Sequence, residues 1–249
     1  MARTYEALTR AAKDNLIALE ELKAFDAGPK AWPNLVAAPR VPAECVEEYH
    51  CMKQTIAGLR AERQIRTLLF CCSTEGEGNS TVLANFAMTM AAGGDTVLLV
   101  DANLRNPTLH AIFNLEQKSG FSDVLLGRVA VADTIKKTTI SNLSVITCGT
   151  RSANPFSLLD SDRLPLCIEQ IKNLADWVLF DAPPVMTFND ARVLAPVVDG
   201  VIMVIEAEKT RWEVVNSARL RMEQGTGKIL GAVLNKRKMH LPDWAYKML

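Results

Sequence analysis

A glycine-rich stretch holds the residues of this sequence that are best suited to bind phosphate, and it reads EGEGNSTV from Glu75 to Val82. It follows the apolar run TLLFCC and precedes ANFAMTMAAGG, which has the character of a helix. Glycines let a backbone approach an anion closely, and amides at the start of a helix point toward phosphate. The stretch fits the phosphate-loop pattern G-x-x-x-x-G-K-[ST] at Ser80, whose hydroxyl would bind Mg²⁺, but Asn79 stands where the pattern has lysine. A glycine-rich turn without a ligand is the alternative interpretation.

Two aspartates follow apolar runs and are suited to serve a metal. Asp101 ends the run VLLVD and Asp181 ends WVLFD, which two prolines follow as in the second carboxylate motif of P-loop NTPases. A buried charge is costly without a partner, and a metal or its bound water would be such a partner. For Asp101 the alternative is a carboxylate that caps the following turn. Each stretch is a weak signal by itself, whereas the three in this order favour a nucleotide site.

The elements that must position these residues are short apolar runs alternating with helical stretches. The runs cover residues 67–72, 96–101, 143–147, 177–181, 200–206 and 229–235. They are too short for helices and are mostly apolar throughout, as strands of a parallel sheet buried on both faces should be. Helical spacers imply right-handed crossovers, so we expect an α/β fold with a doubly wound, mostly parallel sheet. In such sheets ligands bind beyond the carboxyl ends of the strands, where all three stretches fall.

The first 44 residues differ from this pattern, and we divide the chain into an N-terminal extension, 1–44, and a domain, 45–249. Apolar residues recur at three- and four-residue steps over 4–25, which predicts an amphipathic helix. Residues 28–44 carry four prolines and read as an extended linker. A second helix is expected from Val46. The extension is either a docking arm or a segment packed back on its own domain.

Composition excludes several classes of protein. Lys+Arg and Asp+Glu both number 28, so the balanced charge gives no support to bulk binding of nucleic acid or an anionic membrane. The six cysteines form no C-x-x-C pair, which favours a reducing cytoplasm over a disulfide framework or a zinc site. There is no secretory apolar region at the start and no run of about 18 apolar residues. We therefore expect a cytoplasmic protein whose membrane link comes through a partner.

Several stretches together resemble a known family. They are GEGNSTVLANFA, VLLVDANLRNPTLH, SGFSDVLLG, NPFSLLDS, WVLFDAPPV, ARVLAPVVDGVIMVIEAEKT and ILGAVLN. The sequence from about Glu47 to Asn235 resembles the cytoplasmic kinase domain of bacterial tyrosine kinases (BY-kinases), P-loop NTPases that accompany capsule and exopolysaccharide chain-length regulators. Partition and division-site ATPases, which are related, would also carry a lysine near the start of the loop, where this sequence has Ser73 and Thr74.

The resemblance implies a role for each matching position. ATP or ADP would be held by the loop and by an asparagine near the adenine, the positions being Gly76, Glu77, Gly78, Asn79, Ser80, Thr81 and Asn235. Mg²⁺ would be held by Ser80, Asp101 and Asp181, and the catalytic positions would be Asp101, Asn103 and Asp181. In the family, the γ-phosphate of ATP is transferred to tyrosines in the C-terminal tail of a neighbouring subunit.

The sequence departs from the family at the positions that do chemistry. Asn79 replaces the lysine that would reach the β- and γ-phosphates, and residues 71–82 contain no Lys or Arg. Asn103 replaces the second acid of a D-x-D pattern, and an amide cannot accept a proton from tyrosine at neutral pH. The family's E-x-x-R-x-x-R assembly helix reads Glu47, His50 and Lys53, and its tyrosine-rich tail is reduced to Tyr246.

These departures favour a degenerate kinase that regulates an exopolysaccharide machine by contact. The expected partners are the cytoplasmic segment of a membrane polysaccharide co-polymerase, at the inner face of the membrane, and further copies of the chain, with no nucleic acid. One alternative is a weakly active tyrosine autokinase or ATPase. A second alternative, from another class, is a partition-type ATPase that positions cargo.

Overall fold

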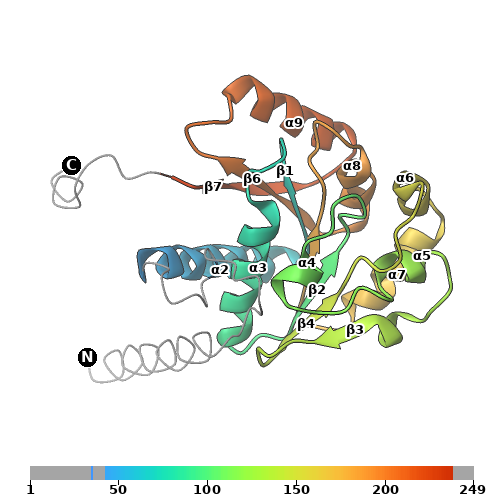
Figure 1. Cartoon of the computed structure of the whole chain (residues 1–249). Coiled ribbons are helices and arrows are strands. Elements are labelled where there is room, and N and C mark those ends of the chain that lie inside the picture. The colour runs from blue at the N-terminus through green and yellow to red at the C-terminus, as the bar shows by residue number, and fades with distance from the viewer. Residues whose placement is uncertain (1–34, 36–42, 238–249) are drawn as a thin grey trace, which may run out of the picture.

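The computed structural model describes Leu35 and residues 43–237, which form a seven-stranded sheet with helices on both faces (Figure 1). The chain runs through α2 (Ala43–Arg63), β1 (Thr67–Cys72), α3 (Asn79–Ala92), β2 (Val97–Asp101), α4 (Leu109–Ile112), α5 (Phe121–Leu125), the 3-10 turn η1 (Val131–Thr134), β3 (Ile135–Lys137) and β4 (Leu143–Ile146). It continues through α6 (Pro155–Leu159), α7 (Arg163–Lys172), β5 (Trp177–Asp181), α8 (Asp190–Leu194), η2 (Ala195–Val197), β6 (Gly200–Glu206), α9 (Trp212–Gln224) and β7 (Ile229–Asn235).

The strand order β3-β4-β2-β5-β1-β6-β7 confirms the predicted doubly wound sheet. Every neighbouring pair is parallel except β3 and β4, which are antiparallel. Strand β3, with the sequence IKK, is absent from the expected set because three half-polar residues at a sheet edge give no apolar run. The order places β1 between β5 and β6, and β5 beside β2. The loop after β1 and the aspartates that end β2 and β5 therefore lie together at the carboxyl ends of these strands.

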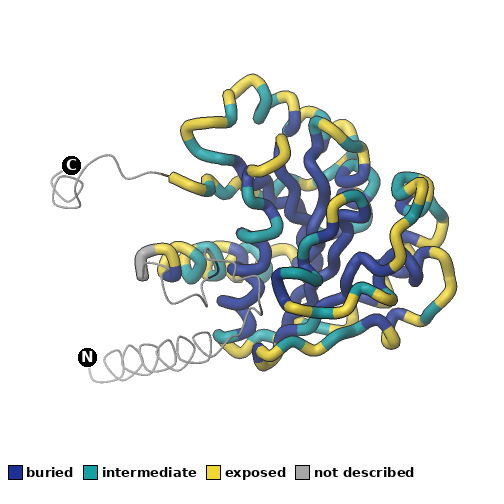
Figure 2. Tube along the Cα trace, viewed as in Figure 1, coloured by how far each residue is buried: buried dark blue, intermediate teal, exposed yellow. Residues whose placement is uncertain are grey.

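Alternate residues of the central strands enter two separate cores. Leu68 and Phe70 of β1 pack with α2 and α3 on one face, whereas Leu69 and Cys71 pack with the helices α5, α7, α8 and α9 on the other. Figure 2 shows the central strands buried between these helical layers. Because both faces are covered, these strands are apolar along their whole length, as the sequence predicts for a parallel sheet.

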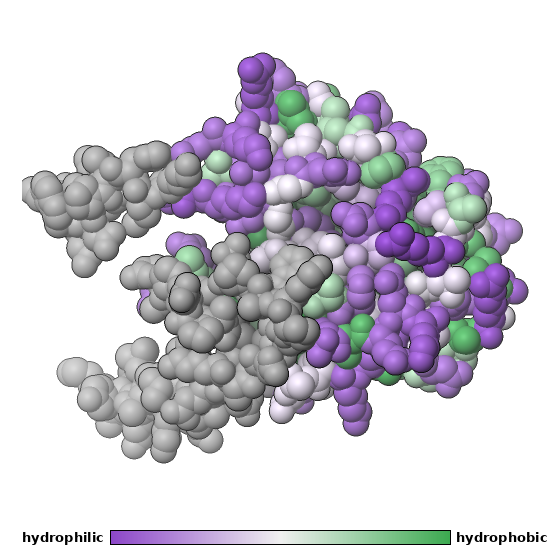
Figure 3. Space-filling model, viewed as in Figure 1, coloured by the Kyte–Doolittle hydropathy of each residue, from purple (hydrophilic) through white to green (hydrophobic). Residues whose placement is uncertain are grey.

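Strand β7 corrects one expectation, since it is not buried on both faces. Residues Gly231, Ala232 and Leu234 are exposed, and the Leu234 side chain retains 64% of its accessibility. β7 is an edge strand that pairs only with β6 within the described part of the chain. Elsewhere on the face shown in Figure 3 the described surface is mainly hydrophilic, with small separate hydrophobic areas.

The N-terminal extension predicted over 1–44 includes three described residues, Leu35 and residues 43–44. The helix expected over 4–25 lies outside the described residues, and so does most of the linker expected over 28–44. The linker prediction is wrong at its end, because residues 43 and 44 form the start of α2. The side chain of Leu35 is 1% exposed and belongs to the same core as Val46 and Ile56 of α2. The helix predicted from Val46 is α2, which begins three residues earlier. None of the described helices is long and apolar enough to cross a membrane.

Candidate functional site

The turn between β1 and α3 has the backbone form of a phosphate loop. Gly76 and Gly78 have φ angles of 84° and 91°, in the left-handed region that favours glycine. Gly78 is the residue that precedes α3, and Asn79, Ser80 and Thr81 form the first turn of that helix. The first amides of a helix have no acceptor within it, so they are available to an anion.

The side chain of Asn79 points into the protein rather than out of the loop. Its Nδ2 donates to Oδ1 of Asp181 at 2.7 Å, to the carbonyl of Phe70 at 3.0 Å and to that of Ala182 at 3.3 Å. Asn79 is 6% exposed, and its Oδ1 is buried without a hydrogen-bond partner among the described residues. The residue in the lysine position therefore ties the loop to β1 and to the end of β5.

Asp101 and Asp181 lie side by side at the ends of neighbouring strands. They are partners in the β2–β5 register, and both are fully buried. Burial raises the pKa of Asp181 to about 6, against the lowering effect of hydrogen bonds from Ser80 and Asn79. Burial, and then the charge of Asp181, raise the pKa of Asp101 well above its ordinary value. Two adjacent buried carboxyl groups disfavour double ionisation unless a cation joins them.

The predicted magnesium ligands are brought together. Ser80 Oγ donates to Oδ2 of Asp181 at 2.6 Å, and Oδ1 of Asp101 is buried with no partner in the described part of the chain. Mg²⁺ commonly takes one or two carboxylates and completes its shell with water and substrate phosphates. A hydroxyl, two carboxyl groups and an unpartnered carboxyl oxygen beside a phosphate loop fit that requirement.

Asp101 also caps the turn that follows it, which is the alternative role considered for this residue from the sequence. Its Oδ2 accepts the amides of Thr108 and Leu109 at 3.1 and 3.0 Å, where α4 begins. One oxygen therefore caps the following turn while the other remains unpartnered. The two interpretations of this residue are compatible because a carboxylate has two oxygens.

Asn103 does not contact Asp181 or the loop in any hydrogen bond of the described residues. Its Oδ1 accepts the amide of Asn106 at 3.1 Å, which closes a local turn. The same turn is held from outside by Arg105, whose guanidinium makes two 2.9 Å bonds to the buried Asp190 and covers the ring of Phe188 at 4.2 Å. Arg105 thus joins the loop after β2 to the loop after β5, a link that sequence reasoning missed.

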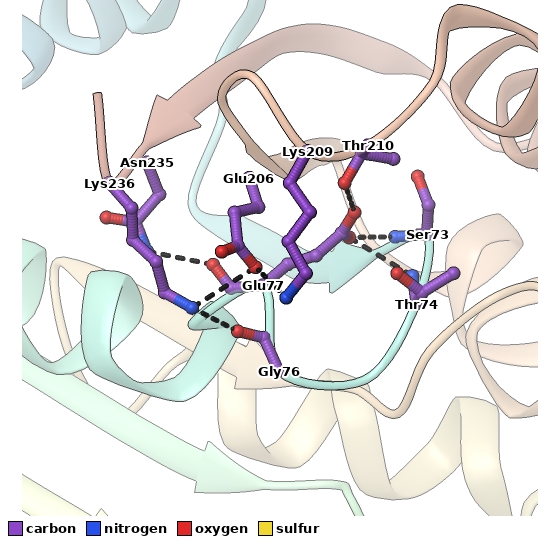
Figure 4. A network of polar contacts seen from close by, with 9 residues as sticks. All are labelled: Ser73, Thr74, Gly76, Glu77, Glu206, Lys209, Thr210, Asn235 and Lys236. Atoms are coloured by element: carbon purple, nitrogen blue, oxygen red, sulfur yellow. Dashed lines mark hydrogen bonds and ion pairs between the residues drawn. The ribbon is translucent and has the colours of Figure 1, made fainter. Parts of the chain in front are cut away.

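Glu77 binds its own loop from within (Figure 4). Its Oε2 accepts the amides of Ser73 and Thr74 at 2.6 and 3.1 Å, and its Oε1 accepts the hydroxyl of Thr210 at 2.5 Å. The loop is therefore braced against the segment after β6. Each contact lies within the protein, so Glu77 acts here as a brace, whereas the resemblance assigns it to nucleotide binding.

Asn235 and Lys236 reach the loop from the end of β7 (Figure 4). Asn235 Nδ2 donates to the Glu77 carbonyl at 2.8 Å, and Lys236 Nζ donates to the Gly76 carbonyl at 2.5 Å. Asn235 is thus at the predicted site, in contact with the loop itself. Lys236 was not among the predicted site residues, although it directly follows Asn235 in the sequence.

The helix that matches the family's assembly motif is α2. Lys53 forms a 2.7 Å ion pair with Asp95 and donates to the carbonyl of Met90 at the end of α3. Burial and the charge of Lys53 lower the pKa of His50. The Lys53 side chain therefore makes its contacts within its own chain. Tyr246, the candidate phosphate acceptor in the tail, lies outside the described residues.

A cavity of about 340 Å³ lies on the other side of the sheet from the phosphate loop, at the amino ends of the strands. It opens where β1, β6 and β7 begin, and its lining includes Arg63, Ile65, Lys172, Asp199 and Lys228. Lys172 and Asp199 pair at 3.0 Å there. This cavity is separate from the phosphate loop, which lies at the carboxyl ends of the strands.

The doubly wound sheet and the glycine loop between β1 and α3 define a P-loop NTPase. A family described as AAA domain matches residues 67–218. The putative tyrosine-protein kinase CapB of Staphylococcus aureus is 35% identical over 190 residues, covering 76% of this chain and 83% of CapB. The crystal structure of the chimerical protein CapA2B2 is 28% identical, with a TM-score of 0.76 over 84% of this chain and 92% of that one. The chain therefore belongs to the bacterial tyrosine kinase family, as its motifs predict.

A more distant likeness concerns the fold alone. The septum site-determining protein MinD from Pyrococcus horikoshii, solved with Mg-ADP, is 22% identical, with a TM-score of 0.60 over 74% of this chain and 76% of that one.

Proposed function

We propose that this protein is a degenerate member of its family, a pseudokinase that regulates exopolysaccharide or capsule production by contact. Its partner would be the cytoplasmic segment of a membrane polysaccharide co-polymerase, which would hold it at the inner face of the membrane. The observation that carries the proposal is the position of Asn79. Its side-chain amide is neutral, and its Nδ2 already donates to Asp181 and to two backbone carbonyls, so it offers a phosphate neither a positive charge nor a free donor.

Loss of the lysine weakens transfer more than it weakens binding. A charge-assisted hydrogen bond contributes about 1.5–3 kcal/mol, which is roughly ten- to a hundredfold in affinity. Phosphoryl transfer depends almost entirely on positioning and on stabilisation of developing charge, so the loss in rate is larger. Asn103 adds a second defect, because its amide accepts no proton and its oxygen is already bonded to Asn106.

Residual nucleotide binding is part of the proposal. The loop keeps Gly76 and Gly78, and the open amides of α3 would meet the phosphates. Ser80, Asp101 and Asp181 would hold Mg²⁺, which neutralises charge on the phosphates when it is bound. ATP or ADP would therefore bind weakly, and the nucleotide would not be needed for contact with the partner.

A weakly active autokinase or ATPase is the second candidate. It is favoured by the retained pair Asp101 and Asp181 and by Ser80, which lies 2.6 Å from Asp181. A partition-type ATPase has less support, because it would need ATP-driven dimers and a basic surface, and the chain has balanced charge.

A mass measurement of the purified full chain after incubation with Mg-ATP separates these functions. The degenerate kinase gains no phosphate, whereas an autokinase gains the mass of phosphate on a tyrosine such as Tyr246. A parallel pull-down with the cytoplasmic segment of the co-polymerase should recover the protein equally with and without ATP. Phosphorylated tyrosine, or a pull-down that requires ATP, would contradict the proposal.

A further inference from the structure

Lys236 places a side-chain cation against the phosphate loop. It follows the last residue of β7, in a left-handed backbone conformation with φ of 58°. Its Nζ lies 2.5 Å from the carbonyl oxygen of Gly76 and 3.2 Å from Oε2 of Glu206. The two contacts hold the ammonium group between the loop and the end of β6 (Figure 4).

The neighbouring atoms show that Lys236 lies against the glycine before α3. A Cβ added to Gly78 would lie 2.3 Å from Asn235 Nδ2 and 3.8 Å from Lys236 Cε. Both side chains therefore cover the residue from which the open amides of α3 begin. This proximity puts a positive charge beside the part of the loop that is shaped for phosphate.

The charge of the loop itself leaves a place for this cation. Residues 71–82 carry Glu75 and Glu77 and no basic residue. Lys209 is also near, but it pairs with Glu206 at 3.0 Å and has no hydrogen bond to the loop in the described structure. Of these two lysines, Lys236 alone contacts the loop.

We propose that Lys236 supplies the positive charge for nucleotide phosphates that Asn79 cannot supply. This inference rests on the residual nucleotide binding proposed above. The Gly76 carbonyl is a neutral acceptor, whereas a phosphate oxygen carries a negative charge and therefore attracts the ammonium group more strongly. Lys236 is exposed, so its ammonium can turn from Gly76 to the phosphate while Lys209 continues to neutralise Glu206.

Titration calorimetry with Mg-ADP, and with magnesium pyrophosphate as a probe without base or sugar, tests the role of Lys236. The variants are Lys236→Met, Lys236→Arg and the matched control Lys209→Met, each as the full chain. Lys236→Met should weaken binding of both probes about tenfold or more, the effect of one charge-assisted bond. Lys236→Arg should keep most of the affinity because it keeps the charge, and Lys209→Met should stay close to the unmodified protein.

Four results would overturn the inference. They are unchanged affinity in Lys236→Met, equal losses in Lys236→Met and Lys209→Met, an equally large loss in Lys236→Arg, and an unmodified protein that binds neither probe at millimolar concentration. The last result leaves the contact-dependent regulator standing, since that function needs no nucleotide. A thermal melt verifies that each variant is folded, and Lys236→Gln replaces Lys236→Met if the methionine variant melts early. Phosphorylated tyrosine in the mass measurement would contradict the proposed function without affecting the role of Lys236.

Discussion

The side-chain amide of Asn79 donates a 2.7 Å hydrogen bond to the buried carboxyl group of Asp181. This contact joins the first residue of α3 to the last residue of β5. A lysine at position 79 would be long enough to leave the loop for a phosphate, whereas asparagine is short and finds its partners inside the protein. The position has therefore gained a structural role where the family pattern has a chemical one.

Replacement of Asn79 by alanine should destabilise the fold. The change removes the Nδ2 group, which donates hydrogen bonds to Oδ1 of Asp181 and to the carbonyls of Phe70 and Ala182. These three buried acceptors would each lose a hydrogen bond. A buried group left unsatisfied costs about 1–3 kcal/mol, which lowers the Tm by about 2–4 °C per kcal/mol in a protein of this size. Thermal unfolding measures it, with Asn173→Ala, an exposed asparagine that bonds to the Glu169 carbonyl, as the control. Equal Tm values for the two variants would show that the Asn79 bonds contribute nothing.

The buried carboxyl pair predicts how stability changes with pH. The pKa of Asp181 is raised from 3.8 to about 6 in the folded protein, so the folded state binds more protons than the unfolded state between these values. The contribution of Asp181 is fully present below about pH 4 and is lost as the pH rises through about 6. Each pKa unit corresponds to about 1.4 kcal/mol.

Asp181→Asn should therefore raise the free energy of unfolding at pH 7 and flatten its pH dependence between about 4 and 6. Asparagine keeps an acceptor for Asn79 and removes the repulsion with Asp101. Denaturant unfolding at several pH values measures the effect, with the exposed Asp133→Asn as the control. A variant less stable than the unmodified protein at pH 7 would mean that the Asp181 charge is well compensated.

Leu35 predicts where the N-terminal extension becomes part of the domain. Its buried side chain packs in the core of α2 and α3, so Leu35→Ala should cost about 2–5 kcal/mol. The exposed Leu166→Ala, at 68% accessibility, should have little effect. Deleting residues 1–34 should then preserve the Tm better than deleting 1–42. If the two deletions melt together, the contact of Leu35 does not contribute to stability.

Whether residues 1–34 form a docking arm is decided by the same deletion. Loss of the partner in a pull-down, with an unchanged Tm, would assign these residues to docking. Early melting of the protein without 1–34 would show that they pack on the domain.

Nucleotide should stabilise the protein only slightly. A ligand at about a hundred times its dissociation constant adds about 2.7 kcal/mol, and the proposed weak binding stays far below that ratio at millimolar Mg-ATP. A melting scan should therefore show little or no shift. A large shift at micromolar nucleotide would mean that the loop binds phosphate well without the lysine at position 79.

The sequence predicts the bounds of most strands closely, but it predicts neither the edge strand β3 nor the exposure of the edge strand β7. β1, β5, β6 and β7 have the predicted bounds, because each is an apolar run flanked by residues of another character. β3 leaves no such signal, and the exposure of Leu234 depends on which strand is at the edge, which local pattern does not reveal. The bounds of the apolar strands thus follow from local composition, whereas the exposure of the edge strand β7 depends on topology.

The residues of the candidate site also fall into two groups, those that the sequence predicts and those that only the fold reveals. Asp101, Asp181 and Ser80 are predictable because strand ends and a loop pattern locate them. The direction of the Asn79 side chain is not predictable from the pattern, because it depends on acceptors that Phe70 and Ala182 provide. Lys236 contacts Gly76 across 160 positions of the chain, so only the folded topology reveals it.

In the proposed function, Asn79 and Asn103 are the two defects that disable phosphoryl transfer. Asn79→Lys should restore affinity for nucleotide and little transfer, because Asn103 still provides no carboxylate. Asn103→Asp alone should restore less, since the γ-phosphate remains unanchored. The double variant should hydrolyse ATP, and its gain should greatly exceed the sum of the single gains, as for residues that act as a unit.

The most direct measurement is phosphate release at saturating Mg-ATP by the unmodified protein, the two single variants and the double variant, each with its Asp181→Asn counterpart as the blank. The proposed degenerate kinase should show release above the blank in the double variant and release close to the blank in the unmodified protein. Release by the unmodified protein at the level of the double variant, abolished by Asp181→Asn, would contradict this proposal, because the site would then be active as it stands.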